Sequence, residues 1–182
     1  MKASPLQLDW VSYPALQFEA HQLGEQAAAT AGGAIPTNVQ ARVTYYSDGR
    51  HGAELRLESA AEEAPYTFAV HVAATFRFDL QRALEAYRCT PQALPGFVAA
   101  NIVRVLYSGA RELLATATAR GPHGPALIES VLIEPADVSI GSMEPIDLVM
   151  QKAFGVQPQE DAAPAAVQDA TDSPGRPRRR KR

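Results

Sequence analysis

Cysteine is almost absent from this sequence, since Cys89 is the only one in 182 residues. A single thiol cannot form an intramolecular disulfide, so we expect a fold without one, as is usual in a reducing compartment. The first ten residues also lack the apolar core of a secretory signal peptide, because they carry Lys2 and alternate polar with apolar residues. Both observations predict a cytoplasmic protein.

Sequence motifs for catalysis and for metal or cofactor binding are missing as well. We find no nucleophile motif, no phosphate-binding glycine loop and no metal-ligand spacing, because the four histidines, His21, His51, His71 and His123, are scattered. Cys89 has neither a second cysteine nor a basic cluster beside it, which is typical of an inert thiol. We therefore expect no enzyme activity, no metal and no cofactor.

Charge is unevenly distributed along the chain. The sequence has 17 basic and 20 acidic side chains, and six of the basic ones lie between Arg176 and Arg182. The rest of the chain therefore has 17 − 6 = 11 basic and 20 acidic side chains, a formal charge of −9. Residues 157–182 are rich in Pro, Ala, Gln, Asp and Arg and show no apolar periodicity. We predict one domain at residues 1–155 and a disordered tail with a basic end at residues 156–182.

The stretch from Phe97 to Arg120 predicts one long helix. Its polar residues recur at spacings of three, four and three and form a narrow stripe: Asn101, Arg104, Ser108 and Arg111. The other faces are apolar, so protein must cover the helix on more than one side. Charged residues interrupt the apolar run before it reaches the ~20 residues of a membrane span. Gly121, in a left-handed cap, and Pro122 are expected to end the helix.

Alternating apolar and polar residues predict four β-strands before this helix. These are Leu6–Ala20, Val39–Tyr45, Ala53–Glu58 and Tyr66–Phe78. Pro14 predicts a break or bulge in the first strand, because proline cannot donate to an interior ladder. Asp48-Gly49 predicts a hairpin turn between the second and third strands.

The order of these elements predicts an α+β domain: a four-stranded antiparallel sheet followed by one long and one short helix. Asp79–Leu94 is expected to be a short helical turn and crossover, limited by Pro91 and Pro95, and Leu127–Val138 an extended connection. Ile146 to Ala153 predicts the short helix, ending at Gly155. One sheet cannot cover every apolar flank of the long helix, so we expect a homo-oligomer that places helices between sheets.

The long helix contains a segment that resembles the signature of the SecB family of export chaperones, Leu-Tyr/Phe-Pro-Tyr-Ala-Arg-Glu. Here the segment is Leu106-Tyr107-Ser108-Gly109-Ala110-Arg111-Glu112, with Ser and Gly in place of the Pro and Tyr. Phe18-Glu19-Ala20, Phe68–Phe78 and Ile133–Val138 are similar to further family segments in the same order. The resemblance spans roughly Leu6 to Gly155 and implies four antiparallel strands, then helices, in a tetrameric dimer of dimers.

The resemblance also implies a function. SecB proteins hold unfolded precursor proteins along apolar grooves without ATP and pass them to the SecA motor ATPase. By position it implies client binding by two groups of residues, Val39, Ala41 and Val43 in a strand and Ile146, Val149 and Met150 in the last helix. It implies SecA docking by Glu19, although Ala69 and His71 stand at or beside another acidic docking position. The expected oligomer interface on the long helix consists of Leu106, Gly109, Ala110 and Leu113.

Other interpretations of the same residues remain open. SecB-like folds also occur as chaperones dedicated to one partner, for example an antitoxin, and the departures at Ala69, His71 and Ser108-Gly109 leave room for this function. A small-molecule binder with a curved sheet around a helix would instead need a closed apolar pocket. For each groove residue the alternative is a place in the core. Tyr107, Arg111 and Glu112 resemble an acid–base set, but on a largely buried helix such residues more commonly form a polar stripe.

The basic segment Arg176–Arg182 predicts a salt-dependent contact with either an acidic surface of the protein itself or an anionic partner, such as lipid headgroups, SecA or nucleic acid. The alternative role is solubility alone. If the segment docks, deleting it should leave client holding unchanged and lower co-sedimentation with anionic vesicles or SecA at low salt. Association that persists at low salt after the deletion would leave only the solubilising role.

Overall fold

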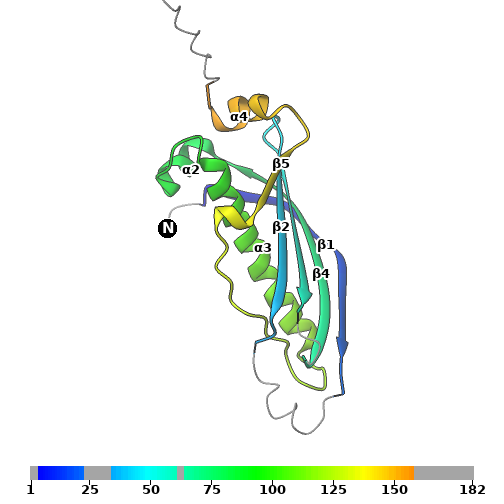
Figure 1. The fold of residues 1–182 in the computed structure, drawn as a ribbon. Coiled ribbons are helices and arrows are strands. Elements are labelled where there is room, and N and C mark those ends of the chain that lie inside the picture. The colour runs from blue at the N-terminus through cyan, green and yellow to red at the C-terminus, as the bar shows by residue number, and fades with distance from the viewer. Residues whose placement is uncertain (1–3, 23–33, 61–63, 158–182) are drawn as a thin grey trace, which may run out of the picture.

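The computed structural model describes residues 4–22, 34–60 and 64–157 and has an α+β architecture, as predicted (Figure 1). Its strands are β1 (Leu6–Ala20), β2 (Thr37–Tyr45), β3 (His51–Ser59), β4 (Tyr66–Phe78) and β5 (Ser139–Ser142). Its helices are α2 (Leu80–Tyr87), α3 (Leu94–Thr118) and α4 (Ile146–Phe154), with a short 3-10 helix, η1 (Pro135–Asp137). Figure 1 shows α3 along one face of the sheet and α4 near its upper end. None of these helices is both long and apolar enough to cross a membrane.

The sheet has five strands, so the prediction of a four-stranded, purely antiparallel sheet was wrong. The strand order is β1-β4-β3-β2-β5, and β5 runs parallel to β2 with Ser139 opposite Arg42. The other neighbours are antiparallel, and β2 and β3 are joined at Gly49, whose φ of 82° suits the predicted turn. Four residues are too few to show a period-2 pattern, which explains why the sequence did not reveal β5.

The long first strand lies at the edge of the sheet and is irregular where the sequence predicts it. Its pairing with β4 shifts register between Leu8 and Trp10 and again between Ser12 and Ala15. The second shift spans Pro14, which has no N–H to contribute to the ladder. The predicted interruption at Pro14 is confirmed, and the edge position makes it tolerable.

The core forms between α3 and the inner face of the three central strands. Val43, Leu55 and Val72 come from these neighbouring strands and are fully buried. They meet the apolar face of α3, whose buried residues include Ile102, Val103, Leu106, Ala110 and Leu114. Each fully buried side chain of this size contributes about 1.5–3 kcal/mol relative to an exposed one. Packing of α3 on the sheet therefore dominates the stability of the fold.

The ends of α3 differ from the prediction. The predicted helix begins at Phe97, whereas α3 begins at Leu94. Pro95 lies in the first turn, where its missing N–H leaves no helical hydrogen bond unmade, so α3 can include it. At the other end Gly121 is not in the left-handed region, whereas Gly124 is, with a φ of 73°. Gly121 has a different role, because a Cβ at this position would clash with the Tyr66 hydroxyl.

An aromatic cluster joins α4 to the sheet. The ring of Phe154 lies 4.9 Å from that of Tyr45 and 5.3 Å from that of Phe78, and His51 stacks on Phe78 at 5.1 Å. His51 is buried, and its Nδ1 accepts a hydrogen bond from the N–H of Tyr46 at 3.3 Å. Burial lowers the pKa of His51 to about 4, because a charged imidazolium would lose its hydration here.

The depressed pKa of His51 predicts a loss of stability in mild acid. The contribution of the neutral ring is complete above the ordinary pKa of 6.5 and is lost as the pH falls through about 4. We expect the free energy of unfolding in urea to drop by roughly 1–3 kcal/mol over this window. His51→Asn keeps an acceptor for the N–H of Tyr46 but has no group that titrates in this range, so its free energy of unfolding should fall less over the same window. Equal losses in both proteins would show that His51 is not the responsible group.

Candidate functional site

The free edge of β2 is only partly covered by another strand. β5 pairs with Arg42 through Tyr45, and Ile35 forms an isolated parallel bridge with Ile128. In the described part of the chain, the stretch Thr37–Ala41 between these contacts has no strand partner on this side. Its backbone groups are available to an added strand.

The segment that would otherwise cover this edge is held against α3 instead. From the bridge to the first β5 pair the chain advances 139 − 128 = 11 residues, while β2 advances only 42 − 35 = 7. The additional residues of the connecting segment loop toward α3. There the Tyr107 hydroxyl donates to the carbonyl of Glu129, and the Arg104 guanidinium donates to the carbonyl of Ile133. These bonds keep the connecting segment off the strand edge.

The six predicted client-binding residues do not line one groove. Val43 and Val149 are completely buried, so the prediction for these two was wrong: Val43 lies in the core beneath α3, and Val149 is on the buried face of α4. Val39, Ala41 and Met150 are half-buried against the core. Ile146 is exposed. The strand residues and the helix residues also lie apart, because α4 packs at Tyr45, about 20 Å along the strand from Val39.

The sequence interpretation missed two exposed leucines on the connecting segment between α3 and β5. Leu132 is 77% exposed and Leu127 is 51% exposed. The segment was predicted only as an extended connection. The sequence did contain a signal for these exposed side chains, because Leu127–Val138 is apolar but is interrupted by Pro135 and has no strand pattern.

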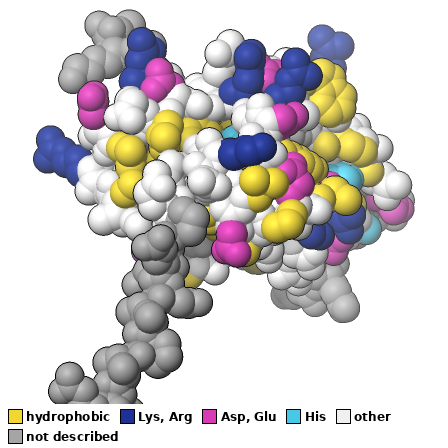
Figure 2. Space-filling model, turned by 90° about the horizontal axis from the view of Figure 1, so that it is seen from above, with side chains coloured by type: hydrophobic (Ala, Val, Ile, Leu, Met, Phe, Trp, Pro, Cys, Tyr) yellow, Lys and Arg dark blue, Asp and Glu magenta, His cyan; other side chains and the backbone are white. Residues whose placement is uncertain are grey.

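A second group of exposed apolar side chains lies near α4. It consists of Ile140, Met143 and Ile146. Figure 2 looks onto this end of the molecule and shows apolar side chains interleaved with basic and acidic ones. The exposed apolar surface is therefore divided into small areas bordered by charge.

The opposite edge of the sheet, β1, carries the largest set of exposed apolar side chains. These are Leu8, Trp10, Val11, Tyr13, Leu16 and Phe18, and Trp10 is 56% exposed. The predicted docking residue Glu19 is exposed on the same strand, opposite Thr67. Ala69 and His71 are half-buried on the adjacent strand β4. A long apolar edge is usually covered by another strand or another chain.

The predicted oligomer interface on α3 is only partly at the surface. Leu106 and Ala110 are buried against the sheet of their own chain, so this part of the prediction was wrong. Gly109 and Leu113 are half-buried, and a Cβ at Gly109 would lie 3.5 Å from the Tyr13 hydroxyl. The exposed stripe of the helix includes Phe97, Arg104, Val105, Ser108 and Glu112. It contains Arg104 and Ser108 of the predicted polar stripe.

The titratable side chains of the described residues serve structural roles where they have partners. Tyr107 and Arg104 bind backbone carbonyls, and Nε2 of His71 lies 4.0 Å from the Glu54 carboxylate. No group of three or more His, Cys, Asp or Glu side chains suited to a metal ion occurs in this part of the chain.

No protein-family model and no curated protein matches the chain. Solved structures that are similar to it include the following two. One is a SecB-like chaperone of Mycobacterium tuberculosis in complex with a peptide from an antitoxin, with 19% identity, a TM-score of 0.46 and coverage of 70% of this chain and 91% of that one. The other is a protein of unknown function from Streptococcus agalactiae, with 10% identity, a TM-score of 0.45 and coverage of 71% and 100%.

Proposed function

We propose that this protein is an ATP-independent molecular chaperone that holds extended or unfolded polypeptide. The observation that carries the proposal is the uncovered β2 edge at Thr37–Ala41, together with the exposed Leu127 and Leu132 on the connecting segment. A strand edge binds any extended backbone through N–H and C=O groups, and apolar burial is non-directional. Backbone pairing and apolar burial together allow the protein to bind clients of varied sequence. The proposal agrees with the resemblance to the SecB family found in the sequence.

We propose a dedicated protein partner as the client in preference to general export through SecA. The resemblance to SecB implies that SecA docks on acidic side chains of the sheet. This chain keeps one of them, Glu19, but has Ala69 and His71 at or beside the second docking position. One exposed carboxylate gives little electrostatic attraction in water. The M. tuberculosis neighbour was solved with an antitoxin peptide, which makes a peptide of that class a suitable first client to test. Holding of unfolded precursor proteins for export is the second candidate, supported by the exposure of Glu19.

We also propose a cytoplasmic homotetramer arranged as a dimer of dimers. The chain exposes apolar side chains on two elements, the edge strand β1 and the outer stripe of α3 around Val105. Two independent self-complementary contacts are what a dimer of dimers requires. A small-molecule binder is less well supported, because two depressions of the described surface, one lined by residues 40–42 and Ser139, the other by residues 77–82, are as polar as they are apolar and so are not closed apolar pockets.

The chaperone proposal predicts that the protein suppresses aggregation of a denatured apolar client without ATP. Leu132→Asp should weaken holding by roughly tenfold, because it replaces the most exposed apolar side chain of the connecting segment by a charge that apolar client surface would have to bury. Gln92→Asp, at another exposed site, is the matched control and should hold normally. Light scattering of the client after dilution measures the effect. Absence of suppression by the unmodified protein would refute the function.

The oligomer proposal predicts that Trp10→Glu breaks one of the two contacts and yields dimers in place of tetramers. The side chain is 56% exposed, so the fold of the single chain should survive the change. Gln17→Glu, at an exposed polar position on the same strand, is the control and should leave the tetramer intact. Multi-angle light scattering at micromolar concentration gives the mass. A monomeric unmodified protein would contradict the assembly.

A further inference from the structure

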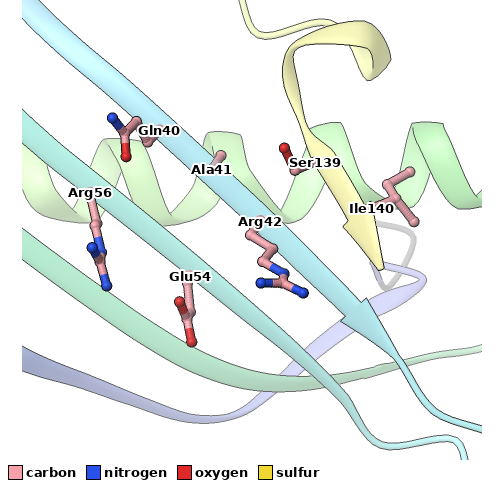
Figure 3. A pocket seen from close by; sticks show the side chains of 7 residues that line it. All are labelled: Gln40, Ala41, Arg42, Glu54, Arg56, Ser139 and Ile140. Atoms are coloured by element: carbon pink, nitrogen blue, oxygen red, sulfur yellow. The ribbon is translucent and has the colours of Figure 1, made fainter. Parts of the chain in front are cut away.

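The open face of the sheet is hollowed where β5 begins. A depression of about 440 Å³ occurs here, lined by Gln40, Ala41 and Arg42 of β2, Glu54 and Arg56 of β3, and Ser139 and Ile140 of β5. Figure 3 shows these seven side chains spread across the adjacent strands β3, β2 and β5. The depression adjoins the end of the uncovered edge stretch Thr37–Ala41. A strand added to that edge would therefore run into it.

Positive charge predominates in this depression. Arg42 and Arg56 are exposed, and within residues 4–22, 34–60 and 64–157 neither guanidinium lies within 4.0 Å of a carboxylate. Glu54 stands opposite Arg42 across the β2–β3 pair, but its carboxylate lies 4.0 Å from His71 on the far side. The lining itself therefore carries two guanidinium groups and one carboxylate.

The position of Arg42 directs its charge toward β5. A Cβ added to Gly141 would lie 3.4 Å from a terminal guanidinium nitrogen of Arg42. The side chain therefore extends over the outer face of the neighbouring strand, and the glycine leaves room for it. Arg56 stands opposite Gln40, one strand further in. The two arginines approach the depression from different strands and leave its edge side open.

We propose that this depression, the arginine notch, selects clients that carry an acidic side chain on an extended segment. The inference rests on the proposed function, because the same uncovered edge would hold the segment. Side chains of an added strand alternate between faces, so every second one would point to the open face, and the one in register with Gln40 would stand about 5 Å from it. An Asp or Glu there lies within reach of both guanidinium groups, which bind carboxylates through paired N–H donors. An apolar residue farther along the segment would lie against Ile140.

The selectivity follows from what each kind of side chain would meet. A carboxylate gains charge-assisted hydrogen bonds from two donors that lack an acidic partner in the described structure. A lysine would meet two like charges and only one carboxylate, that of Glu54, so it is disfavoured. The amide of Gln has nearly the shape of Glu without its charge, which makes it the appropriate reference.

The test compares two fluorescein-labelled peptides of alternating apolar and polar residues, one with Glu and one with Gln at the polar positions. At low salt the Glu peptide should bind the full chain about fivefold more tightly in fluorescence anisotropy, the upper range for exposed ion pairs. The preference should vanish in Arg42→Gln/Arg56→Gln and grow in Glu54→Gln. Arg120→Gln removes an exposed arginine at the end of α3 and should keep the preference.

The outcomes separate the notch from the chaperone function. Equal binding of both peptides, or a preference that survives in Arg42→Gln/Arg56→Gln, would overturn the notch and leave the holding function standing. If neither peptide binds and aggregation is not suppressed, both proposals are wrong. Circular dichroism checks the fold of each variant. Should the double glutamine variant unfold, Glu54→Gln decides, because an unchanged preference in that variant also overturns the notch.

Discussion

Packing of α3 across one face of the sheet is the interaction on which the rest of the structure depends. The helix buries side chains from β2, β3 and β4, and it also supplies the donors that hold the connecting segment after Ile128. Those donors are Arg104 and Tyr107, and their acceptors are backbone carbonyls. One helix therefore stabilises the core and at the same time keeps a neighbouring segment away from the β2 edge.

The two edges of the sheet have different chemistry because of this arrangement. β1 touches α3 near Gly109 through the Tyr13 hydroxyl and exposes large apolar side chains over most of its length, which suits a permanent contact between copies. The β2 edge is shorter, is bordered by charged side chains and is already occupied at one end by β5. A short edge with polar surroundings suits a contact that forms and dissociates. The proposed assembly and the proposed client site thus fall on opposite sides of the sheet.

Much of the fold was predictable because its elements have clear periods. The strands, the turn at Gly49 and the irregularity at Pro14 all follow from local chemistry that the sequence displays. The candidate site was less predictable, since exposure depends on which neighbour covers a side chain. Val39 and Val43 have the same period on the same strand, yet only Val43 is fully buried. Likewise β5 depends on a partner far away in sequence, and Leu132 is exposed because hydrogen bonds hold its segment toward α3.

The parallel pairing of β5 with β2 has a consequence for the order in which this surface forms. The contact between Arg42 and Ser139 closes a loop of 139 − 42 = 97 residues, so it is costly in chain entropy, and we expect it to form after α3 has docked and shortened that loop. Once formed, it is held by only four residues, and short peripheral strands of this kind open well below the energy of global unfolding. The occupied part of the edge is thus the last to close and the first to open. For the proposed function this means that a client segment longer than Thr37–Ala41 would compete with β5 for the β2 edge, and the length of edge open to it would be set by that competition.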